Sequence, residues 1–282
     1  MTAEGERTTA RRALRVAAWA LALAWLVLTA YPLIWVIVTA FKTRAEYSGN
    51  LWGLPSSPTF GNFTDALGKD LSFTRFYLNG LVVTVTAVVV TTFAGALAGY
   101  SLARLRFRGS GLVLGAFVLG LVVPIHATLI PLHRMETAAG LGDTLLGLAC
   151  PYVAFSLPVA VVLFRGFFAS LPVEIEEAAR LDGAGRLRIV FQIAMPLSRP
   201  AVATVVIFTG VTLWNEYAFA LALLESPANY TLPLGLDRFS SAYAVNVPLT
   251  CAAIVMGLAP VIAVYLLAER HITRGLAAGA IR

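Results

Sequence analysis

Six long apolar runs are the feature of this sequence that most constrains its fold. They cover residues 16–41, 77–103, 112–132, 145–168, 201–224 and 248–268. A helix needs about 20 apolar residues to cross a bilayer, and every run reaches that length. The chain is 59% hydrophobic and 13% charged, whereas soluble domains carry about 25% charged residues. We therefore predict an all-α membrane protein with six transmembrane helices.

The first apolar run follows a basic segment, residues 1–15, whose arginines are Arg7, Arg11, Arg12 and Arg15. A basic start is also typical of a signal peptide, but the apolar part of a signal peptide is only about 7–15 residues long. The run 16–41 is much longer. We therefore predict a retained span that follows an N-terminal tail.

The distribution of basic residues predicts the orientation of the spans. With six spans, both tails (residues 1–15 and 269–282) lie on one side of the membrane. Fifteen of the 21 Lys and Arg residues fall on that side and six fall on the other. Because short cytoplasmic loops carry the excess of basic residues, we predict that both termini are cytoplasmic. The same distribution accounts for the net charge of +6 without a nucleic-acid partner.

Proline and glycine positions predict how the spans bend and pack. Internal prolines in the runs 112–132 and 145–168 predict kinks; these are Pro124, Pro131, Pro151 and Pro158. Gly95 and Gly99 form a small-xxx-small pair in the run 77–103. Such a pair lets a second helix approach closely.

The longest polar segment between the last four spans is residues 169–200, called the polar loop below. It holds four of the chain's 15 acidic residues: Glu174, Glu176, Glu177 and Asp182. The orientation predicted above places this loop in the cytoplasm. Its residues alone are compatible with two roles, an amphipathic segment lying on the membrane surface and a docking surface for another protein.

Local signals predict two short helices within the polar loop. Ser170 suits a helix N-cap, and Pro172 suits the first helical turn. Gly183 suits the left-handed residue that ends a helix. We predict a second helical segment over 185–194, ended by Pro196 and Pro200. Helices this short need support from the membrane domain or from a partner.

Motifs for catalysis, nucleotide binding and metal binding are missing from the sequence. It contains no GxxxxGK[ST] phosphate loop, no HExxH and no GxSxG, so we predict no enzymatic activity and no bound cofactor. His126, His133 and His271 lack the spacing of metal ligands. Cys150 and Cys251 are predicted to be ordinary thiols of apolar segments.

The polar loop resembles the EAA loop of permeases from binding-protein-dependent ABC importers. The family pattern is Glu-Ala-Ala, three residues, Gly, nine residues and Ile-x-Leu-Pro. Here it corresponds, in order, to Glu177, Ala178, Ala179, Gly183, Ile193 and Pro196, with Met195 in place of the usual Leu. The segments IPLHRMETAAGLGDTLLGL, RGFFASLP, TLWNEYAFAL and RGLAAGAIR are similar to the carbohydrate-uptake branch, and specifically to the smaller permease of a maltose- or glycerol-phosphate-type pair.

This resemblance implies the type I ABC importer permease fold in the inner membrane of a bacterium. It implies a second permease subunit as a heterodimer partner, two copies of a cytoplasmic ATPase subunit and an extracytoplasmic solute-binding protein. ATP and Mg²⁺ would be used by the ATPase, and the substrate would be a sugar or oligosaccharide. The polar loop would then couple ATPase closure to alternating access, through Glu177, Ala178, Ala179, Asp182, Gly183, Ala184, Ile193 and Pro196.

A second cluster, Trp214, Asn215, Glu216 and Tyr217, lies in the run 201–224. Glu216 is about 16 residues, or roughly 24 Å of helix, from the cytoplasmic end of that run. An acid inside a membrane is costly and by default indicates function. Aromatic and amide groups suit a sugar in the translocation path. An interhelical hydrogen bond to the partner permease would explain Glu216 equally well.

Three other classes compete with this interpretation. The first is an ABC permease for an amino acid, phosphate or polyamine, against which only the sugar-type segments argue. A secondary transporter is the second, and it would need paired charges at the midplane and internal repeats. The third is an intramembrane enzyme, which would need a catalytic pair within its spans.

Overall fold

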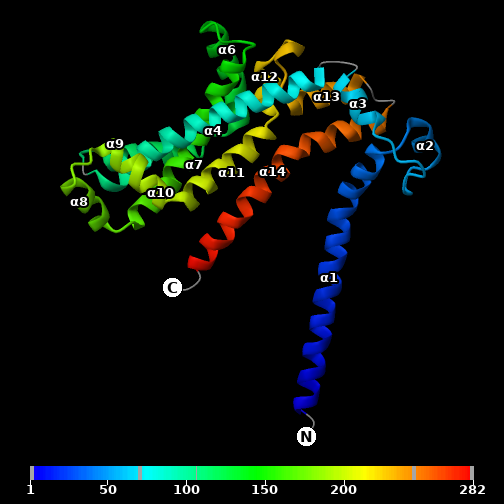
Figure 1. Ribbon diagram of the computed structural model, residues 1–282, viewed down its shortest axis with the longest axis horizontal. Helices are drawn as coiled ribbons and strands as arrows, with labels where there is room; N and C mark the ends of the chain where they lie inside the picture. Colours follow the sequence, from blue (N-terminus) through cyan, green and yellow to red (C-terminus); the bar gives the residue numbers. More distant parts are fainter. Residues whose placement is uncertain (1–2, 69–71, 106, 243–245, 280–282) are drawn as a thin grey trace. The chain divides into compact units, whose positions relative to one another are not determined.

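The computed structural model describes the backbone of residues 3–68, 72–105, 107–242 and 246–279. Side chains are described for residues 12, 14–68, 72–105, 107–237 and 246–266. His271 and most of the two predicted tails therefore lie outside the described side chains. Over the described residues the chain consists of helices and loops without a strand, which confirms the all-α prediction (Figure 1).

The chain divides into two units, described separately here. One unit comprises residues 1–70 and 239–256, and the other comprises residues 71–238 and 257–282. The first contains α1 (Ala3–Ala40), α2 (Arg44–Gly49) and α3 (Gly61–Gly68). The second contains α4 (Ser72–Arg104), α5 (Ser110–Gly120), α6 (Ile125–Ala138), α7 (Leu145–Ser170), α8 (Val173–Leu181), α9 (Arg186–Arg188), α10 (Met195–Leu197), α11 (Arg199–Trp214) and α12 (Ala218–Leu223). Two helices, α13 (Leu232–Ala242) and α14 (Val247–Gly279), contribute residues to both units.

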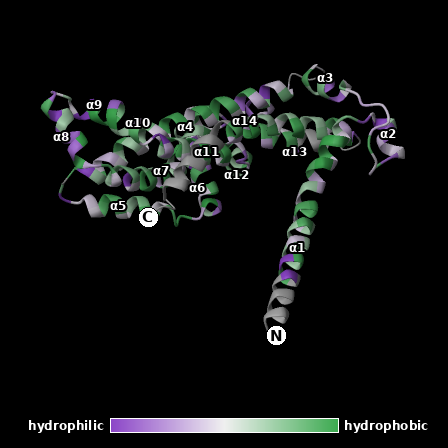
Figure 2. Ribbon diagram, turned by 60° about the horizontal axis from the view of Figure 1, so that its bottom comes forward, coloured by the Kyte–Doolittle hydropathy of each residue, from purple (hydrophilic) through white to green (hydrophobic). Residues whose placement is uncertain are grey.

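Four helical stretches are long and apolar enough to cross a membrane: Leu14–Ala40, Ser72–Arg104, Leu145–Ser170 and Val247–Leu266. Two bent helix pairs meet the same criteria when each is counted as one span, which gives up to six spans. The side chains of α1 from residue 14 to residue 29 are all exposed. Most of the described part of this helix is coloured as hydrophobic in Figure 2. A helix that is apolar on all sides suits lipid or the helices of another subunit.

The predicted span 112–132 is not one helix. Its residues belong to α5 and α6, which are bent by 100°. Pro124 occupies the N-cap position of α6, and proline disfavours a helical conformation in the residue before it. Pro131 lies inside α6 without interrupting it.

The predicted span 201–224 is also interrupted, because α11 ends at Trp214 and α12 begins at Ala218. The carboxylate of Glu216 accepts hydrogen bonds from the backbone N–H groups of Phe219 at 2.8 Å and Ala220 at 3.3 Å. These are donors that the first turn of a helix leaves free. Glu216 therefore starts a new helix in the middle of an apolar run.

Helices α4 and α7 pack closely, as the small-xxx-small pair predicted. A Cβ atom added to Gly95 would lie 2.8 Å from the Cβ of Ala160, and one added to Gly99 would lie 2.7 Å from the Cβ of Phe164. Both distances are shorter than side-chain contacts permit. Around this contact is a buried cluster of Ala96, Tyr100, Ala160, Phe164, Phe168, Ile189, Val190, Ala194, Ala201 and Val205. The cluster joins α4 and α7 to the polar loop and to α11.

Candidate functional site

The polar loop begins at the end of α7, where Ser170 is the last helical residue. Its hydroxyl donates to the carbonyl of Phe167 at 2.8 Å, so the prediction that Ser170 caps the next helix is wrong. Pro172 holds the N-cap position of α8 instead, without a side-chain cap. The helical backbone of α7 continues through Ser170, where its hydroxyl bonds back to the preceding turn.

Gly183 ends α8 with a left-handed residue, as predicted, at φ +80°. The N–H of Gly183 donates to Arg180 at 3.0 Å, and the N–H of Ala184 donates to Ala179 at 2.9 Å. This pair of bonds is the Schellman motif, which satisfies the last carbonyl groups of a helix. The sharp turn places the next segment at a new angle to α8.

The second half of the polar loop is helical from Arg186 to Leu197, and a π-helical turn spans Ile189–Ala194. The prediction that Pro196 ends this segment is wrong, because Pro196 lies inside α10. The wider π turn ends two residues before Pro196, a residue that cannot donate a backbone hydrogen bond. The break comes at Ser198, and α11 begins at an angle of 83° with Pro200 in its first turn.

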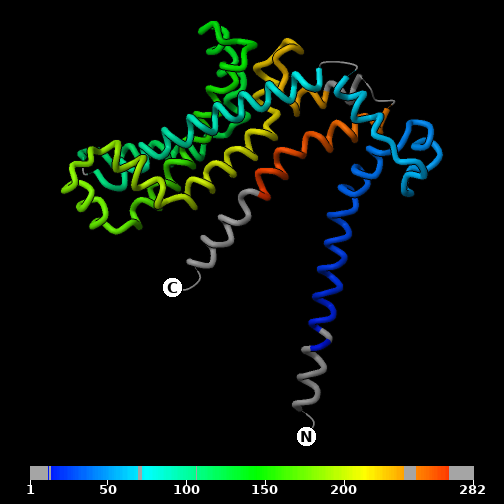
Figure 3. The backbone as a smooth tube through the Cα atoms, in the orientation of Figure 1, coloured from blue at the N-terminus to red at the C-terminus, as the bar shows by residue number. Residues whose placement is uncertain are grey.

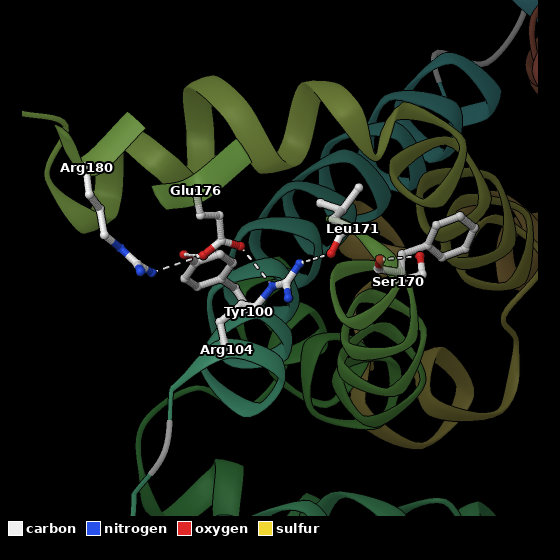
Figure 4. A network of polar contacts seen from close by, with 7 residues as sticks. Tyr100, Arg104, Ser170, Leu171, Glu176 and Arg180 are labelled. Atoms are coloured by element: carbon white, nitrogen blue, oxygen red, sulfur yellow. Dashed lines mark hydrogen bonds and ion pairs between the residues drawn. The ribbon is translucent and has the colours of Figure 1, made fainter. Parts of the chain in front are cut away.

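A buried network of charges holds the inner side of α8 against α4 (Figure 4). Glu176 accepts a hydrogen bond from the Tyr100 hydroxyl at 2.9 Å and pairs with Arg104 Nε at 2.8 Å. It also pairs with Arg180 at 3.1 Å. The Arg104 guanidinium donates to the carbonyl of Leu171 as well. The side chains of Glu176 and Arg104 are 4% and 9% exposed, and charges this deeply buried need partners.

The residues predicted to couple this chain to an ATPase lie elsewhere on the polar loop. Five of them are exposed, namely Glu177, Ala178, Asp182, Gly183 and Pro196. Three are half-buried, namely Ala179, Ala184 and Ile193. Of the adjacent acids, Glu176 is therefore buried and Glu177 is exposed. Sequence reasoning missed Glu176, Tyr100 and Arg104, although the four-residue spacing of Glu176 and Arg180 signals an ion pair.

Most side chains of the Trp214–Tyr217 cluster form hydrogen bonds with other residues of this chain. The indole N–H of Trp214 donates to Gly257 at 3.1 Å, and Glu216 accepts from the Tyr152 hydroxyl at 2.8 Å. The Tyr217 hydroxyl lies 3.3 Å from Asp237. Asn215 is exposed. The Glu216 carboxylate thus has an interhelical partner on α7 of its own chain.

Glu216→Ala is expected to destabilise the protein by about 1–3 kcal/mol, because Tyr152 would lose its acceptor and α12 would lose its cap. Thermal unfolding in detergent measures this loss. Asn215→Ala is the matched control, since Asn215 is exposed and its amide donates to the carbonyl of Val211 in the preceding turn. If Glu216→Ala unfolded like wild type but abolished transport, Glu216 would belong to the translocation path instead.

Asp143 joins the turn between α6 and α7 to the loop after α12 through hydrogen bonds. It accepts hydrogen bonds from the N–H groups of Glu225 at 2.9 Å and Ser226 at 3.1 Å. Its own N–H donates to Leu223 at 3.2 Å. Burial raises the pKa of the Asp143 carboxyl, but the hydrogen bonds from Ser226 and Glu225 outweigh burial and hold that pKa below its ordinary value.

The lowered pKa of the Asp143 carboxyl predicts the pH range in which its hydrogen bonds to Glu225 and Ser226 persist. A carboxyl whose pKa is lower in the folded state stabilises that state above its unfolded pKa, and the stabilisation is lost as the pH falls through the folded pKa. The amides of Glu225 and Ser226 should therefore resist hydrogen exchange between about pH 5 and pH 8. They should lose protection only below about pH 3.9.

Asp143→Ala is expected to expose both amides at neutral pH. Asp143→Asn should retain part of the protection, because asparagine tolerates the left-handed backbone found here, at φ 52°. Equal protection in wild type and Asp143→Ala would contradict the assigned role of this carboxylate.

An apolar cavity of about 500 Å³ lies between α4, α11 and α14. Its polar side chains are Thr84, Thr92 and Trp214, and the Trp214 N–H is already bonded to Gly257. This lining offers few hydrogen-bond partners for sugar hydroxyls. Among the described residues no group of three His, Cys, Asp or Glu side chains is placed to hold a metal.

Comparison with known proteins places this architecture in a family. Residues 91–276 match the family of inner membrane components of binding-protein-dependent transport systems. The diacetylchitobiose uptake permease NgcG of Streptomyces coelicolor is 34% identical over 93% of this chain and 87% of its own. The trehalose transport permease SugB of Mycobacterium tuberculosis is 32% identical over 89% of this chain and 92% of its own. A chain of a bacterial ABC transporter that imports the acidic polysaccharide alginate aligns with a TM-score of 0.81, at 26% identity, over 93% of this chain and 97% of that chain.

Proposed function

Because this chain belongs to the family of inner membrane components of binding-protein-dependent transport systems, we propose that it is the permease subunit through which an ATP-driven importer takes up a sugar or oligosaccharide. The chain has the type I ABC importer permease fold and is a multi-pass protein of the inner membrane. The observation that carries the proposal is the difference between the two sides of α8. One side of this helix is fixed to α4 by buried charges, and the other side is exposed.

In the proposed orientation both termini and the polar loop are cytoplasmic, as the excess of basic residues indicates. The exposed side of α8 then contacts a cytoplasmic ATPase subunit. A second permease completes a heterodimer. One ATPase copy then contacts α8 of this chain, and the other contacts the corresponding helix of the second permease. The ATPase uses ATP and Mg²⁺, and this chain binds no cofactor.

The exposed residues of the polar loop have distinct proposed roles. Glu177 and Asp182 contact the ATPase, and Gly183 provides the turn that sets the angle between α8 and the next segment. When the two ATPase subunits close on ATP, the polar loops move and the spans switch between inward- and outward-facing states. Such a switch requires packed elements with two discrete arrangements.

A sugar is favoured over other solutes by the relatives named for diacetylchitobiose and trehalose and by the alginate transporter. A solute-binding protein delivers the sugar to the side opposite the polar loop. We place most sugar contacts in the partner permease, because the Trp214–Tyr217 cluster of this chain is largely bonded internally. Uptake of an amino acid, phosphate or polyamine remains the alternative substrate class.

Site-specific cross-linking tests the proposed docking surface. Leu181 ends α8 and is 89% exposed, so we expect Leu181→Cys to cross-link to the ATPase in membranes that contain all subunits. Cys150 is exposed and is replaced by serine, whereas Cys251 is buried and stays. Leu112→Cys on α5 is the control, because Leu112 is 82% exposed but lies in a helix assigned to the membrane. Equal cross-linking at both positions, or none at Leu181, would contradict docking through α8.

A further inference from the structure

We infer that α4 carries the movement of α8 to the break between α11 and α12, and that Glu176 is the positioning residue that fixes α8 to α4. This inference rests on the proposed function, in which α8 receives the movement of the ATPase. It adds the route by which that movement reaches the opposite end of α4 and the break after Trp214.

The first step is the anchor at the polar-loop end of α4. Tyr100 and Arg104 lie one turn apart on α4, and both contact the Glu176 carboxylate, at 2.9 Å and 2.8 Å. Arg104 also bonds to Leu171, in the link between α7 and α8. The helix α8 therefore cannot tilt without moving α4 or breaking a buried ion pair (Figure 4).

The second step is the stiffness of α4. It is a single helix of 33 residues, about 50 Å long at 1.5 Å per residue, and Figure 3 traces it as one unbroken helix. It contains no proline, whereas α7 and α14 do. The apolar runs that form α5–α6 and α11–α12 are interrupted. Among these helices α4 is therefore the one best suited to transmit a displacement along its length.

The third step is the far end of α4. The Tyr77 ring meets the Trp214 ring edge-on, with 5.3 Å between ring centroids. The Asn79 amide donates to the carbonyls of Ala228 at 2.9 Å and Tyr230 at 3.0 Å. This end of α4 thus holds the last residue of α11 and the loop that follows α12. One end of α4 therefore contacts α8, and the other end contacts Trp214, the residue directly before the break at residues 215–217.

An uncoupling experiment on the complete transporter tests this inference. Glu176→Gln keeps an acceptor for Tyr100 but removes the charge that pairs with Arg104 and Arg180. In proteoliposomes with the second permease, the ATPase and the binding protein, we expect ATP hydrolysis to continue. Sugar imported per ATP hydrolysed should fall about tenfold or more, as expected for the loss of a charge-assisted hydrogen bond.

The matched control is Glu225→Gln, which makes the same change at an exposed side chain outside the polar loop and should leave the ratio of sugar to ATP unchanged. A merely structural role for Glu176 would lower uptake and ATP hydrolysis together, in proportion to the amount of assembled complex. That result, or a Glu176→Gln transporter coupled like the control, would overturn the inference. A wild-type complex without ATP-dependent sugar uptake would instead refute the proposed function.

If the Glu176→Gln transporter does not assemble, a milder variant tests the inference. Tyr100→Phe removes one hydrogen bond and leaves the ion pair, so it should assemble and show a smaller loss of coupling. A second readout follows the far end of α4 through Asn215→Cys in the Cys150→Ser background. Its reactivity toward a soluble maleimide should change on ATP binding in an otherwise wild-type complex and change less with Tyr100→Phe. Wild-type coupling and reactivity in Tyr100→Phe would contradict the inference.

Discussion

Gly99→Ala should destabilise the protein by about 1–3 kcal/mol, the usual effect of overpacking a filled interior. The new Cβ would lie 2.7 Å from the Cβ of Phe164 and 2.9 Å from the backbone nitrogen of Arg165. Because the second neighbour is backbone, a side-chain rotation cannot relieve the clash. Helices α4 and α7 would have to separate, and Phe164 belongs to the buried cluster that also holds the polar loop.

Gly166→Ala is the matched control for this change. It makes the same substitution on α7, where an added Cβ meets nothing within 4 Å. Alanine favours a helix over glycine by about 1 kcal/mol, so this variant should be as stable as wild type or more stable. Thermal unfolding in detergent, read with the monodisperse fraction from size-exclusion chromatography, measures both variants. Equal stability of the two would show that α4 and α7 do not approach as closely as described.

Gly183→Val should assemble with its partners but lose most of the ATPase stimulation by the loaded binding protein. Gly183 has φ +80° with open space around it, so the obstacle is the backbone and not a clash. A residue other than glycine pays about 1–2 kcal/mol in this conformation. Relief of that strain would turn α8 away from the angle at which Glu177 and Asp182 meet the ATPase.

Two controls separate the turn from general damage. Gly183→Asn should keep most of the stimulation, because asparagine visits the left-handed region more readily than other residues. Gly185→Val adds the same side chain at an ordinary φ of −70°, also in open space, and should behave like wild type. Normal assembly together with normal ATPase stimulation in Gly183→Val would contradict the role of this turn.

Sequence alone predicted the features that depend on local composition. The length of the apolar runs predicted membrane-spanning helices. The four-residue spacing of Gly95 and Gly99 predicted the close contact between helices at these positions. The left-handed stop at Gly183 follows from the residue type. The helix start was misplaced at Ser170, because a serine just inside the end of one helix has the same local signature as a cap for the next.

Features that depend on distant residues could not be predicted. Glu176 and Glu177 are neighbours in a short helix, and nothing near them in the sequence tells which one faces inward. Glu176 faces inward because it pairs with Tyr100 and Arg104, which lie more than 70 residues earlier in the chain. The break after Trp214 was missed for a similar reason. Glu216 was interpreted as a site within a continuous helix, whereas its carboxylate caps the next helix and pairs with Tyr152.

The central claim is that this chain couples ATP hydrolysis in another subunit to the import of a sugar. Its most direct test is uptake of radiolabelled sugar by proteoliposomes that contain this chain, the second permease and the ATPase. We predict accumulation that requires both internal ATP and the sugar-loaded binding protein outside, and that is abolished by a hydrolysis-deficient ATPase. Uptake driven by a proton or sodium gradient without ATP would contradict the claim and identify a secondary transporter.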